Sequence, residues 1–219
     1  MVIRQSEDNS FTLDRLDHLI YTVPDLDEAI DEIEALLGVR PVIGGRHPDF
    51  GTRNALLGLG GQSYLEIMAP DWEMERPQQG RPFGLDTLEK PRLATWVVRE
   101  ESIEKRMAVA KSYKLDLGEV QHGSREKPDG SIVSWRISDP YAPRLGGMVP
   151  FLIAWGDTPH PADSIPCGGK LVDLRLLYPL PLVLREGLSA LNFDLPVDQG
   201  SPARIIGVIR TTTDDVELG

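Results

Sequence analysis

The stretch Leu16-Asp17-His18-Leu19-Ile20-Tyr21-Thr22-Val23 decides the fold. Its apolar and β-branched residues predict a β-strand. Directly after it, Asp25 fits the N-cap of a helix and Glu28 completes a capping box. Apolar residues then recur on one helical face as far as Leu37. The segment therefore predicts a strand followed by an amphipathic helix that covers one side of a sheet.

The same pattern recurs twice, with strand starts at Leu93 and Leu171 that are almost evenly spaced from Leu16. Each start is followed by a helical pattern and then by short strands punctuated by glycine. The order βαβββ is complete in the first two units, and the third is shorter. Similar segments at equal spacing are typical of internal repeats, so we predict three related units. The predicted divisions are a flexible N-terminus at 1–11 and one domain at 12–219, with modules at 12–76, 92–156 and 169–219.

The composition excludes several classes of partner. Acidic residues number 34 against 23 Lys and Arg, and the formal net charge is -11. Such a surface repels phosphate backbones and anionic membranes, so we expect neither nucleic acid nor a membrane as partner. No apolar run approaches the roughly 20 residues of a membrane span. The single cysteine, Cys167, has no intramolecular partner and the first ten residues are polar, so we expect a cytoplasmic protein.

Two polar residues are predicted to share the face of the sheet that points away from the helix. Strand alternation places His18 with Leu16 and Ile20 on that face. In the last strand of the unit, Glu66 shares a face with Tyr64. The first and last strands of a right-handed βαβββ module lie side by side, which brings His18 and Glu66 within bridging distance of one metal ion. An imidazole and a carboxylate suit Zn²⁺, Mn²⁺, Ni²⁺ or Fe²⁺.

The segments 16–19, 45–54 and 64–70 resemble the glyoxalase-like domain family of the vicinal oxygen chelate superfamily, which includes glyoxalases, bleomycin-resistance proteins and extradiol dioxygenases. The resemblance extends over most of the chain. It implies an α+β fold in which repeated βαβββ modules form a curved mixed sheet around a concave pocket. It also implies that His18 and Glu66 occupy the positions of metal ligands.

The second unit departs from the family pattern. Thr95 and Ile153 occupy the positions that correspond to His18 and Glu66, and neither is a normal metal ligand. If the first two units close the pocket, only half of a metal site remains. Further candidates are Asp173 and Glu217 in the third unit and His122 and His160 in loops. Alternatively, Glu66 is paired with His18 or Arg53 and binds no metal.

Other candidate residues lie near the second and third strands. Arg46 or Arg53 could bind a substrate carboxylate in a bidentate manner, with Asn54 beside them, and His47 could act as an acid or base. The alternative is a solvated basic turn. Trp135 and Trp155 could form a wall of the pocket, although aromatic residues on strands more often belong to the core.

Two functions remain in competition at this level. The first is a metal-dependent isomerase, lyase or dioxygenase that acts on a small oxygen-rich substrate, with Glu66 and His47 as catalytic residues. The second is a metal-free protein that binds or sequesters a small molecule, which the loss of ligands at Thr95 and Ile153 favours. Modules could also pair between two chains, so a homodimer is a further expectation.

Overall fold

The computed structural model describes residues 10–219, which form two β-sheets and four α-helices. Residues 1–9 of the predicted flexible N-terminus lie outside the described residues. The first helix begins at Ser10, inside the predicted flexible segment 1–11. No helix in the described part of the chain is long and apolar enough to cross a membrane. The helices are α1 (Ser10–Arg15), α2 (Leu26–Leu37), α3 (Ile103–Ser112) and α4 (Pro181–Ala190).

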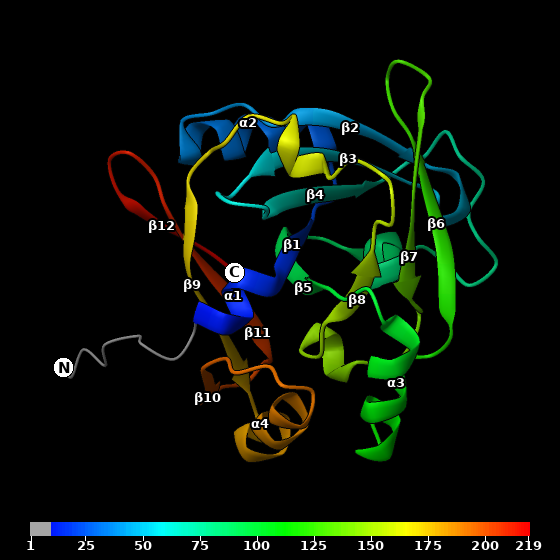
Figure 1. The fold of residues 1–219 in the computed structure, drawn as a ribbon. Coiled ribbons are helices and arrows are strands. Elements are labelled where there is room, and N and C mark those ends of the chain that lie inside the picture. The colour runs from blue at the N-terminus through cyan, green and yellow to red at the C-terminus, as the bar shows by residue number, and fades with distance from the viewer. Residues whose placement is uncertain (1–9) are drawn as a thin grey trace.

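The strands of the first two units close into a barrel (Figure 1), in the order β1-β4-β3-β2-β6-β7-β8-β5. Within each unit the first and last strands are parallel neighbours, β1 with β4 and β5 with β8, and antiparallel pairing of β1 with β5 joins the units. This is the arrangement expected of βαβββ modules. The strands are β1 (Leu16–Thr22), β2 (Val42–His47), β3 (Thr52–Gly58), β4 (Tyr64–Pro70), β5 (Arg92–Arg99), β6 (Val120–Glu126), β7 (Ile132–Ser138) and β8 (Phe151–Ala154).

Helix α2 covers the outside of the barrel, as its apolar face predicts. The side chain of Asp25 caps the helix by accepting hydrogen bonds from the backbone N–H groups of Asp27 and Glu28. The helix ends at Gly38, whose φ of 74° is the left-handed conformation that favours glycine. The buried residues of α2 belong to the same apolar core as the outward side of β1. The core therefore lies between the barrel wall and its helices, which leaves the barrel interior for a site.

The third unit forms a separate four-stranded sheet in the order β10-β9-β11-β12, beside the barrel in Figure 1. Its apolar side shares one core with the barrel: Phe193 packs edge-on against Trp96 at a ring-centroid distance of 5.4 Å. The barrel is thus closed by units one and two, and unit three is excluded from it. The strands are β9 (Lys170–Tyr178), β10 (Val197–Gln199), β11 (Arg204–Arg210) and β12 (Asp215–Leu218).

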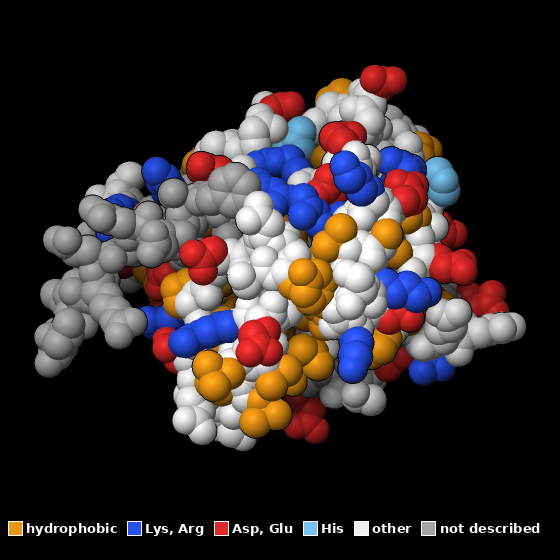
Figure 2. Space-filling model, turned by 60° about the horizontal axis from the view of Figure 1, so that its bottom comes forward, with side chains coloured by type: hydrophobic (Ala, Val, Ile, Leu, Met, Phe, Trp, Pro, Cys, Tyr) orange, Lys and Arg blue, Asp and Glu red, His pale blue; other side chains and the backbone are white. Residues whose placement is uncertain are grey.

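Apolar side chains are also exposed on the face that carries α3 and α4, among acidic and basic groups (Figure 2). They include Leu180, Leu182 and Val183 at the start of α4, which are 62%, 69% and 58% exposed. Single exposed apolar residues of this kind are common on protein surfaces.

A β-bulge in β1 changes the predicted alternation of side chains. The pairing of β1 with β5 shifts between Leu16 and His18, so that Asp17 is the extra residue. As a result Leu16 packs with Leu19 in the core under the helix, while Ile20 belongs to the cluster that faces the barrel interior. The expectation that Leu16 shares a face with His18 and Ile20 was therefore wrong. At this bulge the side chain of Asp17 points toward the imidazole ring of His18.

Candidate functional site

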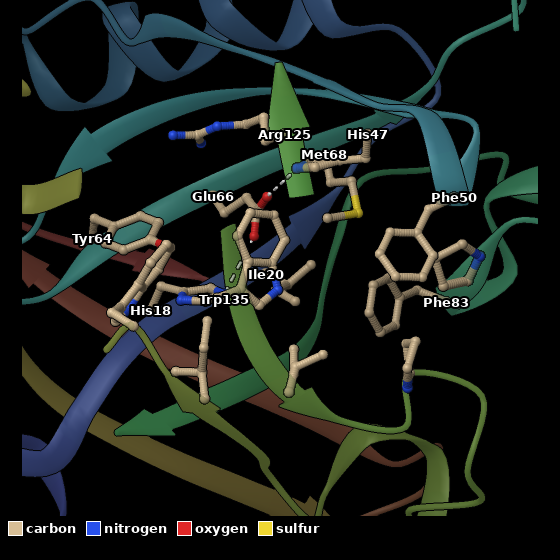
Figure 3. A pocket seen from close by; sticks show the side chains of 15 residues that line it. His18, Ile20, His47, Phe50, Tyr64, Glu66, Met68, Phe83, Arg125 and Trp135 are labelled. Atoms are coloured by element: carbon tan, nitrogen blue, oxygen red, sulfur yellow. Dashed lines mark ion pairs between the residues drawn. The ribbon is translucent and has the colours of Figure 1, made fainter. Parts of the chain in front are cut away.

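A small pocket of about 50 Å³ lies inside the barrel, and Figure 3 shows the side chains that line it. This space is enough for one or two water molecules, which occupy about 30 Å³ each, so only a compact group fits beside the wall as it stands. Most of the wall is apolar or aromatic, and it consists of Ile20, Phe50, Met68, Pro82, Phe83, Trp135, Ile137, Pro140, Ile153 and Trp155. The polar lining residues are His18, His47, Tyr64, Glu66 and Arg125.

His18 and Glu66 form a buried ion pair in this pocket. They lie on the neighbouring strands β1 and β4, with His18 Nε2 3.3 Å from Glu66 Oε2. Burial alone would lower the pKa of His18, but hydrogen bonds to Asp17 and Glu66 outweigh it and raise the pKa to about 9. Burial likewise acts against the charge of Glu66, yet the hydrogen bond from His18 holds its pKa at about 2. At neutral pH the pair is therefore an imidazolium and a carboxylate.

Asp17 holds the other side of the His18 ring. Its fully buried carboxylate accepts from His18 Nδ1 at 2.7 Å, from His160 Nε2 at 3.0 Å and from Trp155 Nε1 at 3.0 Å. Burial opposes its charge, but the hydrogen bonds from His160 and His18 keep its pKa well below the usual range. Asp17 thus fixes the orientation of the imidazolium and ties the segment after β8 to β1. A carboxylate that orients a functional histidine is a common supporting arrangement.

His47 and Asn54 approach Glu66 from the other side. Asn54 Nδ2 donates to Glu66 Oε1 at 2.5 Å, and His47 Nε2 lies 3.7 Å from the same oxygen. His47 Nδ1 is 2.9 Å from the hydroxyl of Thr52. Burial lowers the pKa of His47 to about 4, so its ring is neutral at neutral pH. The pocket therefore holds one charged and one neutral imidazole on either side of a single carboxylate.

Tyr64 covers the face of the His18 ring. The two rings are stacked, with centroids 4.6 Å apart and planes inclined by 21°. An imidazolium over a phenol ring is a favourable cation–π arrangement. Burial raises the pKa of Tyr64 well above its ordinary value, so its hydroxyl keeps its proton. Tyr64 therefore stabilises the charge on His18 and also places an O–H group at the pocket wall.

Arg125, on β6, completes the polar lining. Its side chain is buried, with 6% of the residue exposed, and it extends into the pocket on the side of Glu66 and Tyr64 (Figure 3). Sequence reasoning did not single it out, because the run Ser124-Arg125-Glu126-Lys127 is typical of a solvated turn. The available signal was alternation, since Gly123 and Arg125 are the buried residues of this strand.

The sequence matches the family described as glyoxalase-like domain over residues 16–191. The chain belongs to the glyoxalase-like domain family. Its barrel of paired βαβββ modules agrees with the α+β fold that the sequence predicted. No curated protein matches the sequence.

Three solved structures similar to this glyoxalase-like chain have low sequence identity to it. A hypothetical protein from Staphylococcus aureus superposes with a TM-score of 0.60 at 14% identity, over 92% of this chain and 83% of that chain. Methylmalonyl-CoA epimerase from Mycobacterium tuberculosis superposes with a TM-score of 0.43 at 22% identity, over 70% of this chain and 94% of that chain. Streptomyces coelicolor methylmalonyl-CoA epimerase in complex with 2-nitronate-propionyl-CoA superposes with a TM-score of 0.42 at 19% identity, over 68% of this chain and 99% of that chain. At these identities the likeness concerns the fold alone.

The donor set of this glyoxalase-like domain does not fit a catalytic metal centre with three protein ligands. In the second unit, Thr95 and Ile153 occupy the positions of His18 and Glu66. Thr95 donates a hydrogen bond to the carbonyl oxygen of Gly147, and Ile153 is an apolar residue of the pocket wall. Both oxygens of Glu66 already face protein donors. Across residues 10–219 no group of three His, Cys, Asp or Glu side chains is arranged to hold a metal ion.

The other metal-ligand candidates also lie away from His18 and Glu66 or serve a different purpose. Glu217 is on β12, outside the barrel, and pairs with Arg175. Asp173 is on β9 of the same outer sheet, and His122 is exposed. His160 forms a hydrogen bond with Asp17 and not with His18 or Glu66. A site shared between units one and three is therefore absent among the described residues, because unit three forms its own sheet.

The four residues predicted around β2 and β3 divide between the inside and the outside of the barrel. Strand alternation turns His47 and Asn54 inward, toward Glu66, and turns Arg46 and Arg53 outward. Arg46 pairs with Asp71 and Glu73, and Arg53 pairs with Asp27. The structure therefore does not bring the two predicted carboxylate-binding arginines to the pocket, whereas Trp135 does line it.

Proposed function

We propose that this glyoxalase-like protein is an enzyme that moves a proton at a carbon next to a carbonyl group of a small substrate. The observation that carries the proposal is the buried His18–Glu66 ion pair facing a compact and mostly apolar pocket. Burial of charged groups is energetically costly, and ionisable pairs with shifted pKa values in pockets are typical of functional sites. The membership of the glyoxalase-like family supports an enzymatic role.

In the proposed reaction Glu66 is the base and His18 is the hydrogen-bond donor. The C–H bond of the substrate breaks, its proton goes to a carboxylate oxygen of Glu66, and its electron pair shifts to the carbonyl oxygen. His18, oriented by Asp17, donates its Nε2–H to the oxyanion that develops there. Transfer of the proton from Glu66 to the former carbonyl carbon, with loss of the proton of an adjacent hydroxyl, completes an isomerisation, whereas its return to the original carbon gives back the substrate after exchange with solvent.

The substrate itself would adjust the basicity of Glu66. In the free pocket the His18 hydrogen bond holds the pKa of Glu66 at about 2, which is low for a base. When His18 directs Nε2–H to the substrate oxygen, Glu66 loses this partner and its pKa rises. The apolar wall excludes water and strengthens this effect. Substrate binding and activation of the base are thus coupled in the proposal.

A screen for hydrogen–deuterium exchange tests the proposal. Small oxo acids, their amides and neutral ketones are incubated in D₂O, and loss of the protons next to the carbonyl is followed by NMR. Wild type is expected to accelerate exchange for at least one compound, and Glu66→Gln to abolish the acceleration. The matched control is Glu73→Gln, which changes an exposed carboxylate paired with Arg46 outside the pocket. Exchange that is absent throughout, or equal in Glu66→Gln and wild type, contradicts the proposal.

The second candidate function is the metal-free binding of a small molecule without turnover. The aromatic part of the wall, formed by Phe50, Phe83, Trp135 and Trp155, favours it. This function predicts saturable quenching of tryptophan fluorescence by ligands that show no exchange and no chemical change.

The remaining expectations stay predictions. They are one continuous domain over residues 12–219, a cytoplasmic location, a homodimer, and the lyase and dioxygenase activities.

A further inference from the structure

The side chain of Arg125 is largely buried, and no carboxylate of residues 10–219 pairs with it. Only 6% of Arg125 is exposed, and within residues 10–219 no side chain or backbone oxygen accepts a hydrogen bond from its side chain. Its Nε is among the few buried polar atoms without a partner. A buried charge without a partner is strongly unfavourable, so such a group indicates a missing anion.

Arg81 shows how this chain treats an arginine that serves the fold. It is buried to the same degree, with 6% exposed. Its guanidinium pairs with Asp86 and also donates to the backbone oxygens of Gly51 and Asp71. Arg144, also 6% exposed, leaves its Nε without a partner but donates from Nη1 and Nη2 to the backbone oxygens of Asp139 and Pro140. Among these three buried arginines, Arg125 alone donates no hydrogen bond from its side chain to the described residues.

Arg125 stands at the boundary between the inner pocket and an outer groove. Together with Trp155 it lines both the 50 Å³ pocket and a groove of about 780 Å³ between β2, β7 and the segment after β8. The barrel wall is weakly closed here, because β2 pairs with β6 only at Arg46 and Glu126. Arg125 is thus shared by the groove and by the pocket that holds His18 and Glu66.

Gly44 makes room for the guanidinium. A Cβ atom at this position would lie 2.9 Å from Arg125 Nη1 and 2.3 Å from Asn54 Oδ1. Asn54 Oδ1 is itself buried without a partner, while Nδ2 of the same side chain holds Glu66. Because Gly44 has no side chain, the guanidinium of Arg125 can lie against β2, close to Asn54, which holds the proposed base Glu66.

We propose that Arg125 binds the carboxylate of a singly charged substrate at this boundary and so directs the adjacent carbonyl carbon to His18 and Glu66. This deepens the proposed function and rests on it. His18 contacts the carboxylates of Glu66 and Asp17, whereas Arg125, the other cation of the pocket lining, contacts no carboxylate of residues 10–219. One guanidinium suits a monoanion, whereas a phosphate dianion would need a second cation. The planar fork of a guanidinium also matches the two oxygens of a carboxylate.

Binding of acetate and acetamide tests this proposal, because the two have nearly the same shape and differ in charge. Both are small enough for the pocket, and tryptophan fluorescence reports binding through Trp135 and Trp155 in its wall. Titrations are made at constant ionic strength on wild type and on Arg125→Gln. The matched control is Arg136→Gln on β7, which removes an arginine that pairs with Glu104 outside the pocket. Inorganic phosphate serves as the tetrahedral competitor.

Wild type and Arg136→Gln are expected to bind acetate at least about tenfold more tightly than acetamide or phosphate, as hydrogen bonds to a charged group allow. Arg125→Gln is expected to lose this preference while its resistance to urea stays equal or rises, because an unpaired buried charge is removed. The proposal is overturned if wild type does not prefer acetate, if phosphate competes equally, or if Arg125→Gln binds acetate like wild type.

The outcome separates the two proposals. If Glu66→Gln abolishes deuterium exchange while Arg125→Gln leaves acetate binding unchanged, the proton-transfer function stands and the carboxylate assignment fails. If Arg125→Gln removes acetate binding while no compound exchanges, the anion site stands and the enzymatic function fails.

Discussion

Raising the pH from about 6.5 to about 9 is predicted to destabilise the folded protein through His18. The pKa of His18 is about 9 in the folded protein, against 6.5 as its ordinary value. Over this range the folded state keeps a proton that the unfolded state has released, so stability falls as pH rises. At about 1.4 kcal/mol per pH unit, the free energy of unfolding falls by about 3 kcal/mol. Below about pH 6.5 this contribution is fully present.

His47 acts in the opposite direction on the acid side. Burial lowers its pKa to about 4, so between about pH 4 and 6.5 the unfolded state binds a proton that the folded state does not. Stability therefore falls as the pH drops through this range. Together the two histidines predict a maximum of stability near pH 6.5.

Urea unfolding, followed by tryptophan fluorescence across this pH range, measures both effects. His18→Gln is expected to be less stable than wild type near pH 6.5 and to lose most of the alkaline decline. His122→Gln, which changes an exposed histidine on β6, is expected to keep the wild-type profile. Equal stability of wild type at pH 6.5 and 9, or an unchanged decline in His18→Gln, would refute the assignment of a charged His18.

Two further substitutions test the support of the site and of the third unit. Asp17→Asn removes the charge that holds the His18 ring; it should lower the pKa of His18, measured by NMR titration, and reduce stability by about 3–5 kcal/mol. An unchanged pKa would contradict this. Phe193→Ala removes a buried ring that packs on Trp96 and should cost about 3–5 kcal/mol in urea unfolding, whereas Leu182→Ala, at a residue 69% exposed, should cost less than about 0.5 kcal/mol. Equal losses in the two variants would show that the outer sheet does not stabilise the barrel.

The convergence of His18 and Glu66 could be predicted because it follows from two local rules. Alternation gives the face of each side chain, and the right-handed βαβββ connection makes the first and last strands neighbours. The structure has both features, with β1 and β4 parallel and the two side chains 3.3 Å apart. Neither rule needs information from distant parts of the chain.

Asp17 and Arg125 could not be predicted by these rules. A bulge at Asp17 interrupts alternation, and nothing in the local sequence shows where two residues of β1 will face one residue of β5. Arg125 lies in a charged run that suggests solvent, and its burial depends on how β6 closes against β2. Both residues therefore depend on contacts between the two modules.

The choice between adjacent residues also needs the register. In Arg46-His47 and Arg53-Asn54, alternation requires that only one member of each pair faces inward. The sequence alone allowed the arginines to be the inward members. The pairing of β2 with β3 turns His47 and Asn54 inward instead, after a register shift between Ile43 and Gly45.

The central claim is that His18 and Glu66 move a proton as an ion pair, since within residues 10–219 no group of three His, Cys, Asp or Glu side chains is arranged to hold a metal ion. The most direct test measures deuterium exchange before and after chelation, with metal content determined by plasma mass spectrometry. The account predicts that exchange persists in metal-stripped wild type and is absent from metal-stripped Glu66→Gln. Loss of exchange on chelation, with recovery on adding Zn²⁺, Mn²⁺, Ni²⁺ or Fe²⁺, would contradict it.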